Sequence, residues 1–281
     1  MAREIRKIGV VGLGTMGAGI AQVCVEAGFD AVGREVEAGL GERARERIAH
    51  FLGRKVEKGQ LDTESRDRAL ARLSLTTDLA DCDVVIEAIV EDPDAKRETF
   101  RALEEVVGER AILATNTSAL SVTAIAQETK RPERVVGMHF FNPAPVLPLV
   151  EVVRTELSSD EAVEAAYGLA DRLGKEPIRC NDTPGFVVNR ILIPLLNDCV
   201  RVLDEAGVSP EDLDKAMTRG VNWPIGPCAL IDLIGVDIHV HASEALHDAL
   251  GEPLMAPPER LVRMRDEGLL GRKSGRGFFA Y

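Results

Sequence analysis

A histidine and a glutamate stand on two neighbouring predicted strands, and their types suit acid–base chemistry. His139 lies in "RVVGMHFFNP" and Glu151 in "LPLVEVVR", and the proline-rich stretch "NPAPVLP" joins the two. Imidazole accepts protons near neutral pH, and an adjacent carboxylate fixes its tautomer and stabilises the imidazolium. A glutamate among leucine and valine is also costly to bury without a partner. We predict that these two side chains are in contact. Taken alone, His139 could equally be a core histidine, and Glu151 an acid on an edge strand that points to water.

Three glycines near the start of the chain have the spacing of a dinucleotide-binding loop. Gly12, Gly14 and Gly17 form G-x-G-x-x-G in "GLGTMGAGIAQV", after a predicted strand and at the start of a predicted helix. The first glycine permits a tight turn, the second lets a pyrophosphate approach the backbone, and the third allows close helix–strand packing. The free N–H groups at the helix start, at Thr15 and Met16, are expected to hold the phosphates.

An acidic residue follows the glycines at the distance that such a fold requires. Glu35 stands after "FDAVGR", about 20 positions further along and at the end of the second predicted strand. A carboxylate there hydrogen-bonds the ribose hydroxyls and repels a 2′-phosphate, which favours NAD over NADP. Two alternatives stay open, because Arg34 beside it suits a 2′-phosphate and acids are also common at helix starts.

Polar residues follow another predicted strand in "AILATNTS". Ligands of open α/β sheets bind beyond the carboxyl ends of the strands, so Asn116 and Ser118 are candidates for contact with a ligand. The surroundings of Ser118 show no G-x-S-x-G nucleophile elbow, so a hydrogen-bonding role fits better than a nucleophile. An N-cap for the helix that follows is an equally good interpretation of Ser118.

Predicted strands and helices alternate over the first two thirds of the chain. Strands are predicted at Lys7–Val11, Ala31–Arg34, Asp83–Glu91, Ala111–Ser118 and in the two stretches that carry His139 and Glu151. Helices are predicted at Met16–Ala27, Glu42–Lys58, Thr63–Leu73 and Asp160–Leu173, with another that begins at Pro93. This alternation of buried strands with helices predicts an α/β fold, a Rossmann-type domain whose parallel sheet is covered on both faces.

The strand signals stop after Pro184, and helical patterns take over. Helices are predicted at Val187–Ala206, Pro210–Arg219 and Ile231–Leu250, and a last short helix follows "MAPPERL". We therefore expect a dinucleotide-binding domain over residues 1–184 and an all-helical domain over residues 185–281. One helical stretch spaces its apolar residues in a way that suits either a core helix or a subunit interface: Leu195, Leu196, Cys199, Val202 and Leu203.

Composition and charge exclude several classes of protein. The net charge of −12 disfavours nonspecific nucleic-acid binding, and no apolar run approaches the roughly 18–20 residues of a membrane span. The five cysteines are widely spaced, without a CxxC pair or a Cys/His cluster, so we expect free thiols, a cytoplasmic protein and no metal site. The start "MAREIRK" shows no signal region, and both ends of the chain look natural.

Several stretches together resemble one known family over essentially the whole chain. "VIEAIVE", "ATNTSAL", "GMHFFNPAPVLPLVEVV", "DTPGFVVNRI", "PIGPCALIDLIGVD" and "GRKSGRGFFAY" resemble the short-chain L-3-hydroxyacyl-CoA dehydrogenases, which include bacterial 3-hydroxybutyryl-CoA dehydrogenases. The resemblance implies NAD-linked interconversion of a 3-hydroxyacyl-CoA and a 3-ketoacyl-CoA, in fatty-acid or butanoate metabolism. It also implies that the helical domain serves the substrate cleft and forms a homodimer.

The resemblance assigns roles to individual residues. It implies that His139 is the general acid/base, that Glu151 is its partner, and that Ser118 and Asn189 hydrogen-bond the substrate. Besides the glycine loop and Glu35, the residues at cofactor positions are Glu91, Lys96, Asn116, Ser118, Asn142 and Lys273.

The resemblance also implies a binding site for coenzyme A on the charged helix Glu42–Lys58. Lys58 matches a family lysine that contacts a CoA phosphate, and Lys55 is a second candidate. Phe51 stands where some family members have a serine, which puts that part of the contact in doubt. A solvated helix face with i,i+4 pairs accounts equally well for most of its cations: Arg43, Arg45, Arg47, Arg54, Lys55 and Lys58.

Three other interpretations compete with this one. A dehydrogenase of small free hydroxyacids shares "GLGTMG" but uses a lysine as acid/base and lacks "HFFNP". An inactive dinucleotide-binding relative is disfavoured because His139, Glu151, Ser118 and Asn189 are all intact. A fragment of a multifunctional fatty-acid oxidation protein is disfavoured because the length leaves no room for a hydratase domain.

Overall fold

Eight strands form one sheet in the order β3-β2-β1-β4-β5-β6-β7-β8 in the computed structural model, which describes residues 5–281. All neighbouring strands run parallel except β6 and β7, which are antiparallel. The strands are β1 (Lys7–Val11), β2 (Asp30–Arg34), β3 (Leu73–Leu75), β4 (Val84–Glu87), β5 (Ile112–Thr115), β6 (Val135–Phe140), β7 (Leu149–Arg154) and β8 (Glu176–Asn181).

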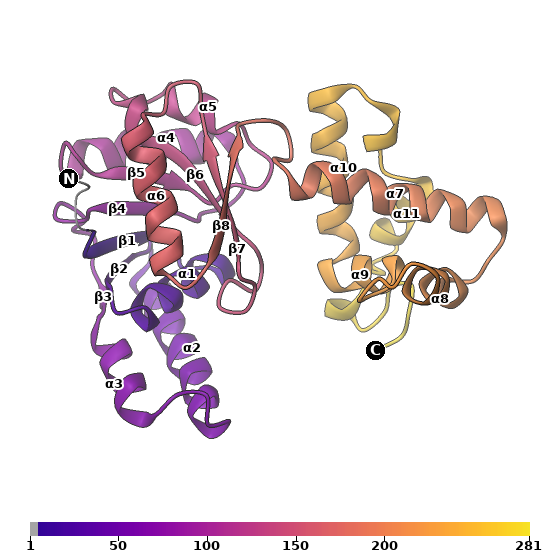
Figure 1. Ribbon diagram of the computed structural model, residues 1–281, viewed down its shortest axis with the longest axis horizontal. Coiled ribbons are helices and arrows are strands. Elements are labelled where there is room, and N and C mark those ends of the chain that lie inside the picture. Colours follow the sequence, from indigo (N-terminus) through magenta and orange to yellow (C-terminus); the bar gives the residue numbers. More distant parts are fainter. Residues whose placement is uncertain (1–4) are drawn as a thin grey trace. The chain divides into compact units, whose positions relative to one another are not determined.

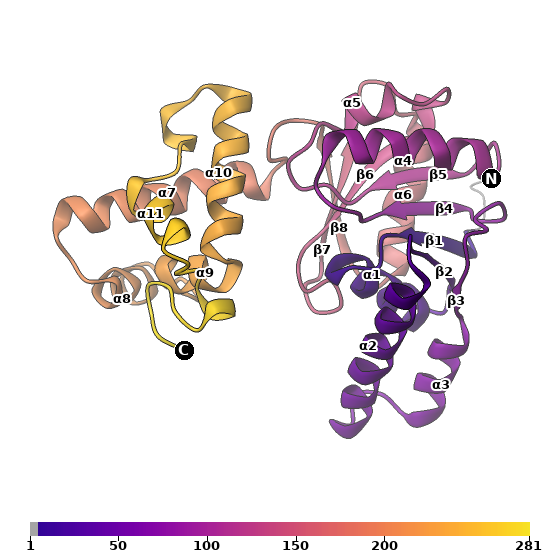
Figure 2. The ribbon, with the colours of Figure 1, turned by 180° about the vertical axis from the view of Figure 1, so that it is seen from behind.

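Helices cover both faces of this sheet, as the alternating pattern predicts. The helices of this part of the chain are α1 (Thr15–Glu26), α2 (Ala38–Glu57), α3 (Thr63–Ala71), α4 (Pro93–Val106), α5 (Val122–Ala126) and α6 (Asp160–Arg172). Helices α1 and α6 pack on one face, against alternate residues of the central strands such as Ile8, Val10 and Met138. Helices α4 and α5 lie on the opposite face (Figures 1 and 2).

The sheet is parallel as predicted, apart from one pair of strands. Residues 141–148 join β6 to β7, and this connection is shorter than the dozen or more residues that a parallel crossover needs. The chain therefore turns back, and β7 pairs antiparallel with β6.

The predicted strand positions also need three corrections. The strand expected at Asp83–Glu91 ends at Glu87, because the Glu87 carboxylate accepts the N–H of Ile89 and turns the chain. Strand β3 was not predicted. It begins at Leu73, the last residue of the helix predicted at Thr63–Leu73, and three residues are too few to show the alternating pattern of a strand. Strand β8 has the polar sequence "EPIRCN" and partly exposed side chains, so it shows no apolar run.

Residues 184–281 form a second compact unit, which contributes no strand to the sheet. The helices are α7 (Val188–Ala206), α8 (Pro210–Gly220), α9 (Pro227–Ile234), α10 (Val236–Leu250) and α11 (Glu259–Asp266). The helix expected at Ile231–Leu250 is broken at Gly235, whose φ of +105° is unfavourable for other residues. None of the helices in residues 5–281 has the length and hydropathy that crossing a membrane requires.

A buried polar cluster and an apolar core hold the helical unit together. Leu196, Val200 and Val240 belong to the core. His239 Nε2 lies 2.9 Å from Asn197 Oδ1, and burial lowers the pKa of His239 to about 4. This imidazole is therefore neutral at physiological pH and belongs to the packing of the unit.

Candidate dehydrogenase site

In the glycine loop between β1 and α1, two of the three glycines are required by close contacts, and the third leaves open space. Gly12 has a φ of +85°, and a Cβ there would lie 2.8 Å from the Ala88 carbonyl oxygen. A Cβ on Gly17 would lie 1.7 Å from the Gly12 carbonyl oxygen, so only glycine allows this approach of helix to strand. A Cβ on Gly14 would meet nothing within 4 Å. The space beside Gly14 is open, which a phosphate needs in order to reach the backbone.

Glu35 stands beside this loop and is held there by hydrogen bonds. Its Oε2 accepts the N–H of Leu13 at 2.7 Å, and its Oε1 accepts the N–H of Val36 at 3.1 Å. Gly33 has a role in the same contact, because a Cβ there would lie 2.8 Å from Leu13 Cδ1. Glycine at position 33 of β2 therefore lets the glycine loop pack against this strand, directly before Glu35.

A cavity of about 870 Å³ opens from the glycine loop. Gly12, Gly14 and Glu35 line it, and apolar lining groups such as Val36 and Ile89 suit a flat base. Arg34 and Arg43 also line the cavity. The open approach at Gly14, the carboxylate at the end of β2 and this apolar wall fit a dinucleotide.

His139 and Glu151 meet directly, because they are opposite each other in the antiparallel ladder of β6 and β7. His139 Nδ1 lies 2.7 Å from Glu151 Oε2. Glu151 is fully buried, whereas His139 keeps 6% of its surface exposed. An ionised carboxylate only accepts hydrogen bonds, so Nδ1 carries the proton and Nε2 is the nitrogen suited to accept one. The arrangement is that of an imidazole base with its orienting carboxylate.

The turn after β5 is fastened to the strand that carries His139. Asn116 Oδ1 accepts the N–H of Phe140 at 2.9 Å. The Ser118 N–H donates to Glu91 Oε1 at 2.9 Å, and its hydroxyl lies 3.5 Å from the same oxygen. The N-cap interpretation of Ser118 is wrong, since Ser121 caps α5 by accepting the N–H of Ala124.

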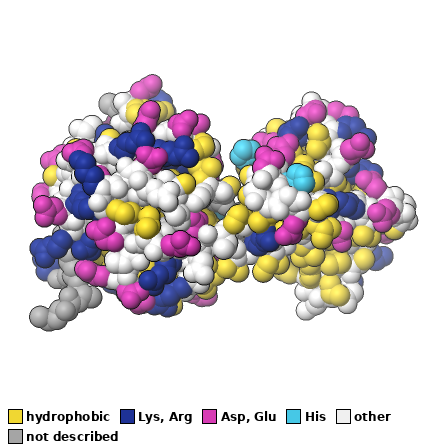
Figure 3. Space-filling view, turned by 90° about the horizontal axis from the view of Figure 1, so that it is seen from above, with side chains coloured by type: hydrophobic (Ala, Val, Ile, Leu, Met, Phe, Trp, Pro, Cys, Tyr) yellow, Lys and Arg dark blue, Asp and Glu magenta, His cyan; other side chains and the backbone are white. Residues whose placement is uncertain are grey.

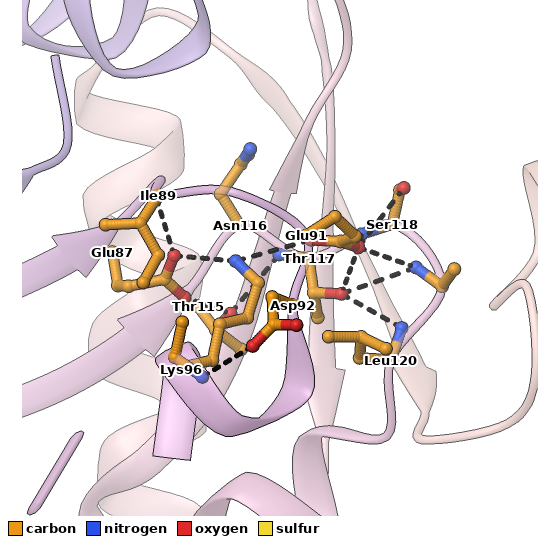
Figure 4. A network of polar contacts seen from close by, with 12 residues as sticks. Glu87, Ile89, Glu91, Asp92, Lys96, Thr115, Asn116, Thr117, Ser118 and Leu120 are labelled. Carbon is orange, nitrogen blue, oxygen red and sulfur yellow. Dashed lines mark hydrogen bonds and ion pairs between the residues drawn. The ribbon is translucent and has the colours of Figure 1, made fainter. Parts of the chain in front are cut away.

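A buried ion pair between Glu87 and Lys96 lies next to this turn (Figure 4). Of its two residues, the sequence analysis identified Lys96 but not Glu87. Glu87, at the end of β4, lies 2.6 Å from the ammonium of Lys96 on α4, and both side chains are almost fully buried. Glu87 also accepts the Thr115 hydroxyl at 2.8 Å. The sequence did contain a signal for Glu87, because an acid at the end of a buried strand needs a partner and the next helix carries Lys96.

Glu91 extends the network toward Ser118. Its Oε1 accepts the Thr117 hydroxyl at 2.5 Å, and its Oε2 lies 3.3 Å from Lys96 Nζ. Burial alone would raise the pKa of the Glu91 carboxyl, but Lys96 and the hydrogen bonds from Thr117 and Ser118 hold it below its usual range. Glu91 is therefore an ionised anchor for the turn 116–118.

The remaining residues at the expected cofactor and substrate positions are divided between the two units. Asn142 precedes Pro143 and lines a second cavity, not the one beside the glycine loop. Lys273 Nζ is 2.6 Å from the Asp237 carboxylate in the helical unit. Asn189 lies in the first turn of α7.

The second cavity, of about 600 Å³, lies between α1, α2 and the loop after β6. Four cationic side chains line it: Arg47, Arg54, Lys55 and Lys58. Lys55 is bonded to the Glu26 carboxylate, whereas Lys58 has no ion-pair partner among residues 5–281. Phe51 also lines this cavity and is 47% exposed. An anionic ligand with an aromatic group matches such a surface, despite the acidic chain as a whole.

The site combines a cavity at the glycine loop, an acid at the end of β2 and a His–Glu pair near the carboxyl ends of the parallel strands. This combination is typical of a dinucleotide-dependent oxidoreductase. Comparison with protein families makes this specific. Residues 7–183 match the model of the 3-hydroxyacyl-CoA dehydrogenase NAD-binding domain, and residues 185–281 match the C-terminal domain of the same family. The chain belongs to the 3-hydroxyacyl-CoA dehydrogenase family: it is an NAD-dependent oxidoreductase that acts on a CH–OH group.

Relatives match over their full lengths. A probable 3-hydroxybutyryl-CoA dehydrogenase of Deinococcus radiodurans is 45% identical over 278 residues, which cover 98% of this chain and 100% of the relative. The crystal structure of Mycobacterium tuberculosis FadB2 is 43% identical, with a TM-score of 0.96 and coverage of 99% and 100%. The (S)-3-hydroxybutyryl-CoA dehydrogenase structure from Ralstonia eutropha is 42% identical, with a TM-score of 0.95 and 99% coverage of both chains.

The buried pair beneath the site gives a prediction on stability. Lys96→Met leaves the Glu87 carboxylate buried without its counter-charge, so we expect the free energy of unfolding to fall by about 3–5 kcal/mol. The control is Arg68→Met, which breaks the exposed ion pair with Glu64 and should cost less than about 1 kcal/mol. Urea denaturation followed by circular dichroism measures both. Equal losses in the two variants would show that Glu87 does not depend on Lys96.

Proposed function

We propose that this protein interconverts short-chain (S)-3-hydroxyacyl-CoA and 3-ketoacyl-CoA thioesters with NAD, and that 3-hydroxybutyryl-CoA is its substrate. The contact of His139 Nδ1 with Glu151 Oε2 at 2.7 Å carries the proposal, because it provides the base that the oxidation of an alcohol needs. The names of the relatives from Deinococcus radiodurans and Ralstonia eutropha support the choice of substrate.

The dinucleotide is expected to lie along the cavity beside the glycine loop. The N–H groups of Thr15 and Met16 at the start of α1 would hold its pyrophosphate, and Glu35 would accept hydrogen bonds from a ribose. When bound, NAD would supply the hydride acceptor for oxidation at C3 of the substrate, and NADH would supply the hydride for the reverse reaction. By family position, six further residues serve the cofactor: Glu91, Lys96, Asn116, Ser118, Asn142 and Lys273.

The proton of the substrate hydroxyl goes to His139. Its Nε2 accepts the proton as the C3–H bond breaks, and the neighbouring carboxylate of Glu151 stabilises the imidazolium that forms. In the reverse direction the imidazolium returns this proton to the carbonyl oxygen. Through its contact with Nδ1 at 2.7 Å, Glu151 keeps the ring in one orientation.

Two polar side chains are assigned to the substrate oxygens. Ser118 is held by Glu91 through its backbone N–H, which positions the turn that presents its hydroxyl. Asn189 stands at the matching family position in the first turn of α7. Preorganised donors of this kind stabilise the charge that develops on an oxygen in the transition state.

The second cavity is the proposed site for the phosphates of coenzyme A. Lys58 is exposed and without an ion-pair partner among residues 5–281, so its ammonium can meet a phosphate at little cost. Lys55 already contacts Glu26, which makes it the weaker of the two expected ligands. Phe51 offers a flat apolar face at the same wall.

A homodimer formed by the helical unit is also proposed. The apolar residues of α7 divide into two sets: Leu196 and Leu203 are buried in the unit, whereas Leu195 and Val202 are 38% and 43% exposed. Ile191, one turn before Leu195, is 62% exposed. Hydrophobic side chains gather on the surface of this unit (Figure 3), and contiguous apolar surface of this kind marks an interaction site.

We further infer that residues 1–184 act as the NAD-binding domain and residues 185–281 as the domain for substrate and dimer contacts. A cytoplasmic location and a role in fatty-acid or butanoate metabolism complete the proposal. Free cysteines in a reducing compartment support it, since all five are unpaired. Fractionation of cells that produce the protein would test the location.

A substrate panel tests the proposed activity. Acetoacetyl-CoA should oxidise NADH with a far higher kcat/KM than free acetoacetate, and NADPH should be a poor substitute because of Glu35. The pantetheine thioester, which lacks the phosphates, should show a raised KM because the cationic cavity is then unused. The reaction is followed by the loss of NADH absorbance. Turnover of acetoacetate at the rate of its thioester would contradict the proposal.

The role of His139 gives a second kinetic prediction. His139→Gln removes the proton acceptor, so kcat should fall by about 10²- to 10⁴-fold while the Kd for NADH stays near that of the wild type. The matched control is His241→Gln, an exposed histidine of the helical unit, which should leave kcat unchanged. Stopped-flow kinetics and NADH fluorescence titration provide the two values. A variant with normal kcat would rule out His139 as the base.

The dimer proposal is tested by placing a charge on the exposed stripe of α7. Leu195→Glu should shift the protein from dimer to monomer, because a carboxylate would be buried in an apolar interface. Val106→Glu, on an exposed apolar position of α4, is the control and should leave the sedimentation coefficient unchanged. Analytical ultracentrifugation separates the species. A monomeric wild type at micromolar concentration would contradict the proposal.

A further inference from the structure

Arg47 reaches from α2 to the glycine loop, which is far from it in the sequence. Its Nη2 donates to the Leu13 carbonyl oxygen at 2.9 Å and to the Gly14 carbonyl oxygen at 3.2 Å. In a trans peptide the carbonyl and the N–H point in opposite directions. Holding these two carbonyls therefore turns the N–H groups of Gly14 and Thr15 away from the guanidinium and limits how the loop can move.

The same guanidinium stands at both cavities of the first unit. Arg47 lines the dinucleotide cavity and also the cationic second cavity, and among residues 5–281 it is the one lining residue that the two share. The group that holds the dinucleotide loop is thus itself part of the wall where an anionic substrate is expected.

The charge of Arg47 is available to a ligand. A solvated helix face would pair it with a carboxylate, but within the described chain no carboxylate lies within 4.0 Å of this guanidinium. Its two hydrogen bonds use Nη2 alone, and the side chain is exposed. The N–H groups on Nη1 remain to donate to a phosphate while Nη2 keeps both carbonyls, and the guanidinium stays charged at any pH at which the protein is folded.

We propose that Arg47 is a positioning residue that couples the two cavities, so that a coenzyme A phosphate bound in the second cavity strengthens binding of the dinucleotide in the first. The phosphate fixes the guanidinium, and the guanidinium in turn orders the glycine loop. The positive charge also reduces the repulsion between two anionic ligands. The inference rests on the proposed function, because it takes coenzyme A as the occupant of the second cavity.

The experiment measures the coupling itself. The Kd for NADH is determined by fluorescence titration without coenzyme A and with saturating free coenzyme A, which has no acyl group and so allows no turnover. The ratio of the two Kd values is the coupling factor, and it must be the same for either order of binding. Arg47→Gln should lower this factor by about five-fold or more relative to the wild type.

Arg45→Gln is the matched control. Arg45 is on the same helix and also donates to a backbone carbonyl, that of Leu73, but it lines neither cavity. The variant removes one charge from α2 and should leave the coupling factor unchanged. A similar fall in both variants would assign the effect to the general field of the helix and overturn the inference.

The other outcomes are equally decisive. If Arg47→Gln weakens NADH binding by the same factor with and without coenzyme A, Arg47 only supports the loop and the coupling is refuted. An unchanged NADH affinity in both conditions refutes it as well. Failure of the wild type to bind coenzyme A would contradict the proposed function, whereas coenzyme A binding with an unaltered coupling factor contradicts this inference alone.

Discussion

The ion pair between Glu87 and Lys96 is the interaction on which the site at the carboxyl ends of the parallel strands depends. A carboxylate and an ammonium removed from water are tolerable only together and with further hydrogen bonds, and Thr115 and Ile89 supply these to Glu87. The pair fastens α4 to β4 and β5. Through Lys96 it also reaches Glu91, whose carboxylate holds the turn that carries Ser118.

The reversal of one strand creates the acid–base pair. Strand β6 runs parallel to β5, so His139 lies near the carboxyl ends of the parallel strands, where ligands bind in this class of fold. Because β7 runs back beside β6, its early residue Glu151 arrives at that same edge. On a parallel strand the same glutamate would lie toward the opposite edge, and the imidazole would have no carboxylate.

The local distribution of charge matters more for function than the total. The chain carries a net charge of −12, yet four cations line the second cavity, and Arg34 and Arg43 line the dinucleotide cavity together with Glu35. Two ligands that both carry phosphates can therefore bind to one acidic protein, because each meets a local surface of suitable sign. Helix α2 contributes to both surfaces, and Arg47 is the side chain where they meet.

The sequence by itself determined the features that depend on near neighbours or on a family pattern. The glycine spacing, Glu35, the alternation of buried strands with helices and the candidates His139 and Glu151 follow from residue type and period. Only the tertiary structure decided that β3 and β8 join the sheet, that Ser121 caps α5, that Glu87 faces Lys96, and that Arg47 holds the loop at Leu13 and Gly14. The physical reason is that sequence period reports which face of an element is buried, whereas contacts between distant residues depend on strand order, direction and register.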